Sequence, residues 1–145
     1  MNICNIRRTF EQKKERGWDT VYVLLDVHGT ILPSTHHEGN KLEFISSDCV
    51  PVLQWFSKRK DIKIILWTSS FSDEIVKVIE WLKTFDIEID YVNRNLECKN
   101  TKYADFALKP YFNIIVDDKS GFEPETDWAE IRTELIQIGE WNKTS

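Results

Sequence analysis

Three carboxylates in this sequence stand directly after hydrophobic runs, where they could act together. Asp26 ends the run VYVLL, and Asp117 and Asp118 follow the run YFNIIV. Two adjacent carboxylates beside a buried segment are costly unless a metal ion or a lysine balances their charge. Carboxylate oxygens suit Mg²⁺, which binds one or two of them together with water and phosphate oxygens. The pattern indicates a candidate Mg²⁺ site, although capping of a turn is an alternative role for Asp26 alone.

A hydroxyl group and a lysine stand near two further hydrophobic runs. Thr68 follows the run IKIILW and is itself followed by Ser69 and Ser70, while Lys109 precedes the run that leads to the paired aspartates. Hydroxyls and backbone N–H groups ahead of a helix can hold an oxyanion. Capping of that helix by Ser70 or Ser72 is a compatible alternative. With Lys109 to neutralise the anion, a spare carboxylate could attack phosphorus, as aspartate nucleophiles do.

The segments that carry these residues alternate between strand and helix patterns. Apolar runs rich in β-branched residues predict strands at about 19–26, 62–67, 87–92 and 111–116. Apolar stripes with helical spacing predict helices at 3–16, 49–60, 73–85 and 126–138, and residues 98–108 are irregular or helical. This order predicts an α/β fold, a three-layer α/β/α sandwich with a mainly parallel, Rossmann-like sheet. Because parallel strands present their carboxyl ends at one edge, Asp26, Thr68 and the paired aspartates should converge there.

The length and composition fit one soluble domain over residues 1–145. Within it, we expect a helix in 1–17, a loop or small flap in 31–46 and a frayed tail in 140–145. The net charge of −5 argues against nucleic-acid binding by field alone, but leaves room for a local basic pocket. Three scattered cysteines suggest neither a disulfide framework nor a zinc site. The apolar runs are too short to span a membrane and no signal region follows Met1, so we expect a cytoplasmic protein without a membrane partner.

The candidate residues together resemble a known family. Asp26-x-His28-Gly29-Thr30, Thr68, Lys109 and Asp117-Asp118 stand in the order of the four motifs of the haloacid dehalogenase-like superfamily, over about residues 21–123. The resemblance implies a Mg²⁺-dependent phosphatase. The segments between the motifs are too short for a large cap, which resembles the capless or minimal-cap branch. Such an open crevice often admits bulky phosphorylated substrates, such as phosphoproteins or nucleic-acid ends.

The resemblance also implies a role for each matching residue. Asp26 would form an aspartyl-phosphate and bind Mg²⁺, and the backbone carbonyl of His28 would be a further metal ligand. Asp117 would bind the metal directly, with Asp118 beside it in the inner or outer shell of ligands. Catalytic roles would thus fall to Asp26, His28, Thr68 and Lys109, and metal binding to Asp26, His28, Asp117 and Asp118.

One residue departs from the family pattern. The family's phosphatases carry an aspartate acid/base two residues after the nucleophile, where this sequence has His28. A backbone carbonyl can bind metal whatever the side chain, and imidazole can itself serve as an acid and a base. Three outcomes follow: a phosphatase that uses His28, a slow enzyme that accumulates phosphoaspartate, and a non-hydrolytic descendant. As an alternative to all three, His28 could be a turn residue that serves only the backbone conformation.

A second class of function is a binding or regulatory module that keeps the fold without turnover. Its partner contacts would include aromatic residues near the crevice, each of which could instead be buried packing: Trp67, Phe71, Trp128 and Trp141. Residues at the rim could contact a leaving group, namely His36, His37, Glu38, Lys119 and Glu123. The turn-rich segment 33–40 is expected to be a surface loop, with a flap over the crevice as the alternative. A hydrolase of carbon–halogen bonds is disfavoured, because such relatives need no metal, whereas Asp117 and Asp118 beside Asp26 call for one.

Overall fold

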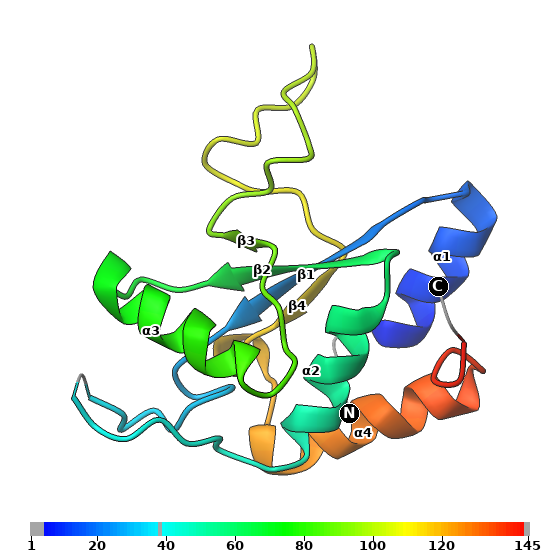
Figure 1. Cartoon of the computed structure of the whole chain (residues 1–145). Helices are drawn as coiled ribbons and strands as arrows, with labels where there is room; N and C mark the ends of the chain where they lie inside the picture. Colours follow the sequence, from blue (N-terminus) through cyan, green and yellow to red (C-terminus); the bar gives the residue numbers. More distant parts are fainter. Residues whose placement is uncertain (1–4, 38, 144–145) are drawn as a thin grey trace.

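The computed structural model describes residues 5–37 and 39–143 (Figure 1). In this part of the chain, the strands β1 (Val21–Asp26), β2 (Ile62–Trp67), β3 (Tyr91–Val92) and β4 (Ile114–Val116) form one sheet. The helices are α1 (Ile6–Arg16), α2 (Cys49–Lys58), α3 (Ser72–Lys83) and α4 (Pro124–Gln137), with a short 3₁₀ turn, η1 (Asp118–Ser120). The sheet order is β3-β2-β1-β4 and every pairing is parallel. The predicted α/β fold with a parallel, Rossmann-like sheet is confirmed.

The register of the sheet brings the ends of three strands together. Strand β1 pairs with β2 along its whole length, so that Asp26 lies opposite Trp67. On the other side of β1, Leu25 lies opposite Val116, the last residue of β4. The chain therefore leaves β4 beside the end of β1, and the residues that follow each strand meet at one edge of the sheet.

The hydrophobic core lies on one face of this sheet. Val21, Val23 and Leu25 belong to a buried cluster to which all four helices contribute, whereas Leu24 and Ile65, which point to the other face, are buried outside it. Figure 1 shows α2 and α4 on the same side of the strands. The three-layer arrangement is therefore not confirmed, since in the described ranges no helix contributes to a second core on the opposite face.

An irregular arm, residues 94–112, meets the opposite face of the sheet and rises away from it (Figure 1). Tyr22 of β1 packs edge-on against Tyr111, with ring centroids 5.9 Å apart. The Tyr22 hydroxyl also donates a hydrogen bond to Glu97 Oε1 at 3.1 Å. These contacts fix both ends of the arm to the sheet and settle residues 98–108 as irregular.

Both outer strands are shorter than predicted, and polar side chains explain why. Asn113 Oδ1 accepts a hydrogen bond from Tyr22 N at 2.8 Å, so the side chain takes a place that a strand carbonyl would occupy and β4 begins only at Ile114. On the other edge, Asp90 Oδ2 accepts from Ile64 N at 2.8 Å and β3 begins only at Tyr91. The predicted strands at 111–116 and 87–92 are thus confirmed in place and reduced in length.

The ends of the described chain are packed against helices. Gly17 ends α1 in the left-handed conformation, as its position predicts, while Ile3 lies outside the described residues. Near the C-terminus, Arg59 donates to Glu140 and Trp141 stacks on Trp55, so these two tail residues are not frayed. None of the described helices combines the length and the apolar character needed to cross a membrane.

Candidate active site

Three carboxylates meet at the edge of the sheet where β1 and β4 end. Asp26, Asp117 and Asp118 each offer one oxygen atom, and these atoms all lie within 4.8 Å of one another. Asp26 is the last residue of β1, whereas Asp117 and Asp118 follow β4 at the start of η1. The structure therefore brings together the three carboxylates that the sequence predicts to converge.

The Asp118 carboxylate is enclosed but incompletely bonded. Its Oδ1 atom is buried and has no hydrogen-bond partner among the described residues. Its Oδ2 atom lies over Gly29, so close that a Cβ atom at this position would be 2.5 Å from it. A buried carboxylate oxygen without a partner is costly, which favours a cation at this place. A set of carboxylate oxygens is also the ligand type that Mg²⁺ prefers, so these residues fit the predicted metal.

Thr30 links the two segments that carry the carboxylate cluster. Its buried hydroxyl donates to Asp26 Oδ2 at 3.0 Å and accepts from the backbone N–H of Asp118 at 3.1 Å. Its carbonyl accepts from the indole N–H of buried Trp128 in α4 at 3.0 Å. In the sequence, Thr30 stands out only as the last residue of the motif Asp26-x-His28-Gly29-Thr30. A threonine four residues after a strand-end aspartate, in a tight turn, is the signal that could have identified it.

The carboxylates perturb one another electrostatically. Burial raises the pKa of Asp26 to about 7, and the negative charge of Asp117 contributes to this rise, although the hydrogen bond from Thr30 opposes it. Burial lowers the pKa of His28, and His36, whose ring centroid lies 5.8 Å from that of His28, lowers it further. Asp26 therefore resists ionisation when no cation is bound, and His28 favours its neutral form.

A cavity of about 540 Å³ opens beside the carboxylates. Its lining comes from the ends of β1, β2, β3 and β4 and consists of Asp26, His28, Trp67, Thr68, Ser69, Asn93, Asp117 and Lys119. Four of the predicted site residues thus share this cavity: Asp26, His28, Thr68 and Asp117. Asp118 does not line it, but its carboxylate remains within reach of the other two.

The structure does not bring Lys109 to this cavity. Lys109 is exposed on the arm and lines a separate cavity of about 350 Å³ with Phe106 and Tyr111. The reason is topological: the arm returns to the beginning of β4, at the edge of the sheet opposite to that of Asp117. The lysine that lines the site is Lys119, which sequence analysis places only at the rim and which directly follows the paired aspartates.

Thr68 is held by Asn93, which sequence analysis did not identify. Thr68 N donates to Asn93 Oδ1 at 2.9 Å, and Asn93 Nδ2 donates to Thr68 O at 2.8 Å. The backbone N–H of Thr68 is therefore committed to Asn93, and its hydroxyl donates to Ser70 Oγ and accepts from Ser70 N, both at 3.1 Å. Helix α3 has Phe71 in its N-cap position and no side-chain capping bond, so the predicted serine cap is not formed. An asparagine just after a short strand, here at φ 56°, is the missed signal.

The loop after the first motif packs beside the site. His36 is only 3% exposed at its side chain, and its Nε2 lies 3.3 Å from Oε1 of Glu74 in the first turn of α3. Both residues line a small cavity of about 190 Å³ next to His28. His36 thus lies beside the site rather than on a free surface loop, whereas His37 is exposed and Glu38 lies outside the described residues.

The remaining candidates divide between the site and the core. Trp67 lines the main cavity, and Phe71, 83% exposed, lines the small cavity beside His28. Trp128 is fully buried, which leaves it no direct partner contact. Glu123 is exposed at the start of α4 and does not line the main cavity.

No family model matches this chain, and comparison with curated proteins and with solved structures finds no match. The resemblance to the haloacid dehalogenase-like superfamily therefore rests on the motifs in the sequence.

Replacement of Gly29 by alanine should disrupt the carboxylate cluster. Gly29 has φ +85°, and a Cβ there would lie 2.5 Å from Asp118 Oδ2. Backbone strain and the clash together should lower the free energy of unfolding by about 2–4 kcal/mol, measured by urea denaturation. The matched control is Gly139→Ala, at φ +79° with no atom within 4 Å of the added carbon. It carries only the strain, about 1 kcal/mol. Equal losses in the two variants would contradict the clash.

The raised pKa of Asp26 predicts a pH-dependent effect of Asp26→Asn on stability. A carboxyl group whose pKa is higher in the folded state, here about 7, binds its proton more tightly there. Its contribution to stability is therefore complete below the unfolded pKa of about 4 and is lost as the pH rises through about 7. In a chelating buffer, Asp26→Asn should thus melt above the wild type at pH 8, and the gap should narrow toward pH 4.

Thermal melts across this pH range, with and without Mg²⁺, provide the measurement. Added Mg²⁺ should reduce or reverse the advantage of the variant, because the cation stabilises the ionised carboxylate. A difference in melting temperature that stays constant from pH 4 to pH 8 would show that the cluster does not perturb Asp26.

Proposed function

We propose that this protein is a Mg²⁺-dependent phosphohydrolase of the haloacid dehalogenase-like type, acting on phosphate monoesters through an aspartyl-phosphate on Asp26. The observation that carries the proposal is the cluster of three carboxylate oxygens within 4.8 Å of one another, beside an open cavity. That cavity also presents a hydroxyl, from Thr68, and an ammonium group, from Lys119. Metal ligands, an anion site and a candidate nucleophile thus meet in one place.

The metal would be held by the carboxylates of Asp26, Asp117 and Asp118. The backbone carbonyl of His28 would add a ligand, as the family resemblance implies. When bound, Mg²⁺ would neutralise charge on the phosphate and among the carboxylates. The orphaned Oδ1 atom of Asp118 supports this assignment, because a cation gives it the partner that it lacks.

In the first half of the reaction, a carboxylate oxygen of Asp26 attacks phosphorus and the bond to the leaving oxygen breaks. The Thr68 hydroxyl, which donates to Ser70 Oγ when no ligand is bound, turns its proton to a phosphoryl oxygen. The Lys119 ammonium group stabilises the negative charge of the phosphoryl group. Lys119 thereby takes the role that the family resemblance gives to Lys109. The leaving oxygen takes a proton from His28 in its imidazolium form or from water.

In the second half, water attacks the phosphorus atom of the aspartyl-phosphate, and inorganic phosphate and free Asp26 result. The lowered pKa of His28 keeps its imidazole neutral, in the form that can accept a proton from this water. The same shift leaves little imidazolium near neutral pH, so few molecules can protonate the leaving oxygen in the first half. The enzyme should therefore prefer aryl phosphates, whose leaving groups need little protonation, over alkyl phosphates.

Hydrolysis of an aryl phosphate tests the proposed function. The wild type should release phosphate in the presence of Mg²⁺, and chelation should stop the release. Asp26→Asn should lower kcat by at least about 10³-fold, because the nucleophile is gone. Asp26→Asn, purified in the same way, also serves as the control for contaminating phosphatases, because a contaminant would be equally active in both preparations. Equal rates for wild type and Asp26→Asn from pH 5 to pH 9 would exclude the proposed reaction for this class of substrate.

A binding or regulatory module without turnover is the second candidate, and the histidine in the acid/base position favours it. His28→Asp separates the two functions. If His28 merely weakens an enzyme, the variant should gain about tenfold or more on alkyl phosphates and little on aryl phosphates. Mg²⁺ binding by calorimetry without turnover in either protein would favour the module. A loss of activity in His28→Asp would show that the histidine itself is the acid/base.

The two candidate lysines make a further prediction. Lys119 lines the cavity with Asp26 and Asp117, whereas Lys109 lines the separate cavity on the arm. Lys119→Ala should therefore lower kcat/KM for an aryl phosphate by about 10²-fold, as loss of one charge-stabilising group does. Lys109→Ala should leave it nearly unchanged. Steady-state kinetics of both variants provide the measurement, and the reverse order would restore Lys109 to the site.

A further inference from the structure

The arm, residues 94–112, carries a charge opposite to that of the whole chain. It contains four basic and two acidic residues, in a chain with a formal net charge of −5: Arg94, Lys99, Lys102 and Lys109 against Glu97 and Asp105. Glu97 is engaged at the base of the arm, where it accepts hydrogen bonds from the hydroxyls of Tyr22 and Tyr91. Of the four basic residues, Lys99 and Lys102 stand near the middle of the arm's sequence, whereas Arg94 and Lys109 stand nearer its ends.

Among the residues that the structure describes, these basic side chains have no acidic partner. Elsewhere, Lys13 pairs with Asp61 and Lys63 with Asp90. Within residues 5–37 and 39–143, by contrast, no carboxylate forms an ion pair with any of the four basic residues of the arm. Unpaired positive charge on a projecting segment of an acidic protein favours an anionic partner.

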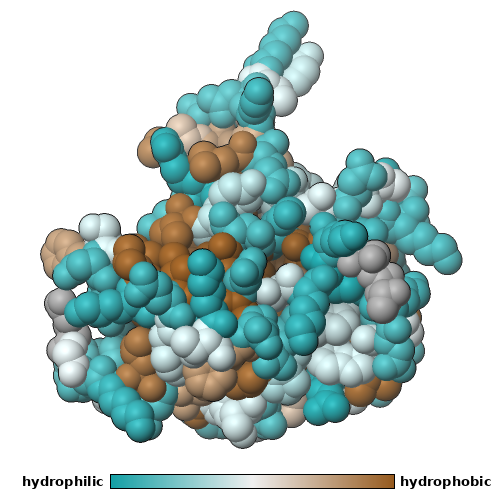
Figure 2. Space-filling model, in the orientation of Figure 1, coloured by the Kyte–Doolittle hydropathy of each residue, from teal (hydrophilic) through white to brown (hydrophobic). Residues whose placement is uncertain are grey.

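The arm also exposes apolar and aromatic groups. Tyr103 is 90% exposed and Leu108 is 94% exposed, and the Lys102 ammonium group lies 5.7 Å from the centre of the Tyr103 ring. Figure 2 shows the arm projecting from the body, with hydrophilic residues at its tip and hydrophobic residues nearer its base. An exposed tyrosine ring beside lysines offers a stacking surface and a charge together.

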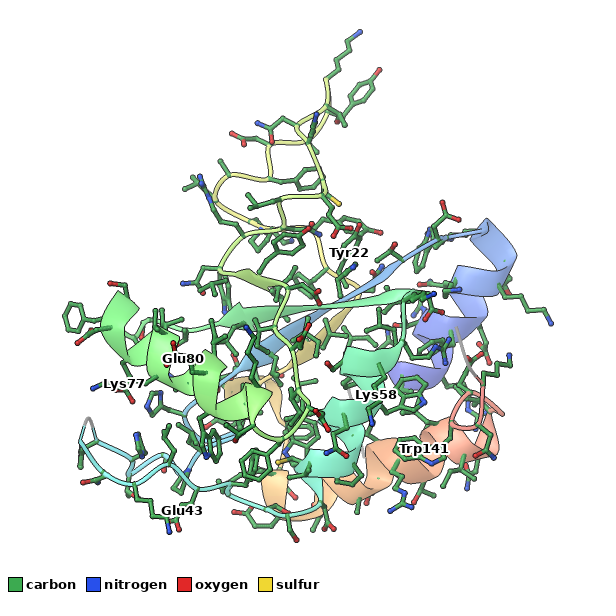
Figure 3. All side chains as sticks on the ribbon, in the orientation of Figure 1. Tyr22, Glu43, Lys58, Lys77, Glu80 and Trp141 are labelled. Carbon is green, nitrogen blue, oxygen red and sulfur yellow. The ribbon has the colours of Figure 1, made fainter. Side chains whose placement is uncertain are left out.

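The arm rises from one face of the sheet. By the alternation of side chains along β1, the candidate nucleophile Asp26 belongs to this same face. Asp26 alternates with Leu25 and shares its phase with Tyr22, which contacts the arm. Figure 3 shows Tyr22 at the foot of the arm. Trp67, opposite Asp26 in the register, lines the cavity, and Asn93 in the same lining leads directly into the arm. An extended substrate leaving the cavity on this face would therefore meet the arm.

We propose that the arm binds single-stranded nucleic acid whose terminal phosphate occupies the candidate active site. The proposal rests on the phosphohydrolase function and specifies its substrate class. A single strand alternates phosphates with flat bases, which matches unpaired lysines interleaved with an exposed tyrosine, and Trp67 offers a second ring beside the terminal phosphate. The net acidic charge of the chain disfavours a polyanion at long range, and the positive charge of the arm opposes this beside the candidate site. A phosphorylated peptide would offer a single phosphate and gives the repeated positive charges no comparable role.

Binding to a single strand tests this role of the arm. The probe is a fluorescent oligothymidylate of about 12 nucleotides, with a phosphate or a hydroxyl at its end, and binding is followed by anisotropy on Asp26→Asn protein to prevent turnover. The double substitution Lys99→Ala/Lys102→Ala should weaken binding by about tenfold and reduce the dependence of log K on log salt by about 1. Tyr103→Ala should weaken it by a similar factor, and Tyr103→Phe should preserve it because the ring can still stack.

The matched control removes the same charge elsewhere. Lys14→Ala/Lys58→Ala replaces exposed lysines of α1 and α2, and Figure 3 shows Lys58 on α2, away from the arm. This control should bind the strand like the parent protein. Equal losses in the two double variants, or no measurable binding by the parent, would overturn the proposal. So would a defect of the arm variant on a phosphotyrosyl peptide but not on oligonucleotides, since the partner would then be a protein.

Hydrolysis separates this inference from the proposed function. Lys99→Ala/Lys102→Ala in the wild-type background should raise KM for a phosphorylated oligonucleotide and leave aryl phosphate hydrolysis unchanged, because the arm tip does not line the cavity. If aryl phosphates are not hydrolysed but the strand binds through these lysines, the phosphohydrolase function fails and the binding role of the arm stands. If aryl phosphates are hydrolysed but the strand is not bound, only the arm proposal fails.

Discussion

The repulsion among three carboxylates is the constraint on which the site depends. Asp26, Asp117 and Asp118 offer oxygens within 4.8 Å of one another, an arrangement that like charges oppose. It persists because Thr30 bonds to both strand ends at once and is itself held by buried Trp128. The fold itself therefore holds the cluster together, and burial, with the negative charge of Asp117, raises the pKa of Asp26 there. On the proposed function, a bound cation would offset this concentration of negative charge.

The placement of the helices determines what can reach the cluster. All four helices contribute to the core on one face of the sheet. The opposite face meets the arm, and it is the face to which Asp26 and its register partner Trp67 belong. A helix over that second face would have closed the approach. The arm, which begins directly after the cavity-lining Asn93, projects from this opposite face (Figure 1). On the proposed function, core stability and substrate access are thus assigned to opposite faces of one sheet.

The sequence predicts the backbone of the site better than its side-chain partners. Hydrophobic runs that end in Asp26, Thr68 and Asp117 specify parallel strands, and parallel strands force these residues to one edge. The same reasoning does not place Lys109 at the site, because Lys109 precedes β4 and so lies near the start of that strand rather than near its end. The role of Asn93 depends on its hydrogen bonds to Thr68, which is distant in sequence, and the periodicity of apolar residues does not predict such contacts. Edge strands shorten for a similar reason, since Asn113 and Asp90 replace backbone partners with side chains.

Charge also orders the events that the proposed function requires. Without a cation, the carboxylates beside the cavity outweigh the ammonium group of Lys119, so an incoming phosphate would be repelled. Metal loading must therefore come before phosphate binding. For a polyanionic strand the net charge of −5 adds a second, longer-range repulsion, which screening weakens only beyond about 8–10 Å. The unpaired lysines of the arm provide an attraction at the periphery that the metal cannot provide there, so the two positive elements would act at different distances on one substrate.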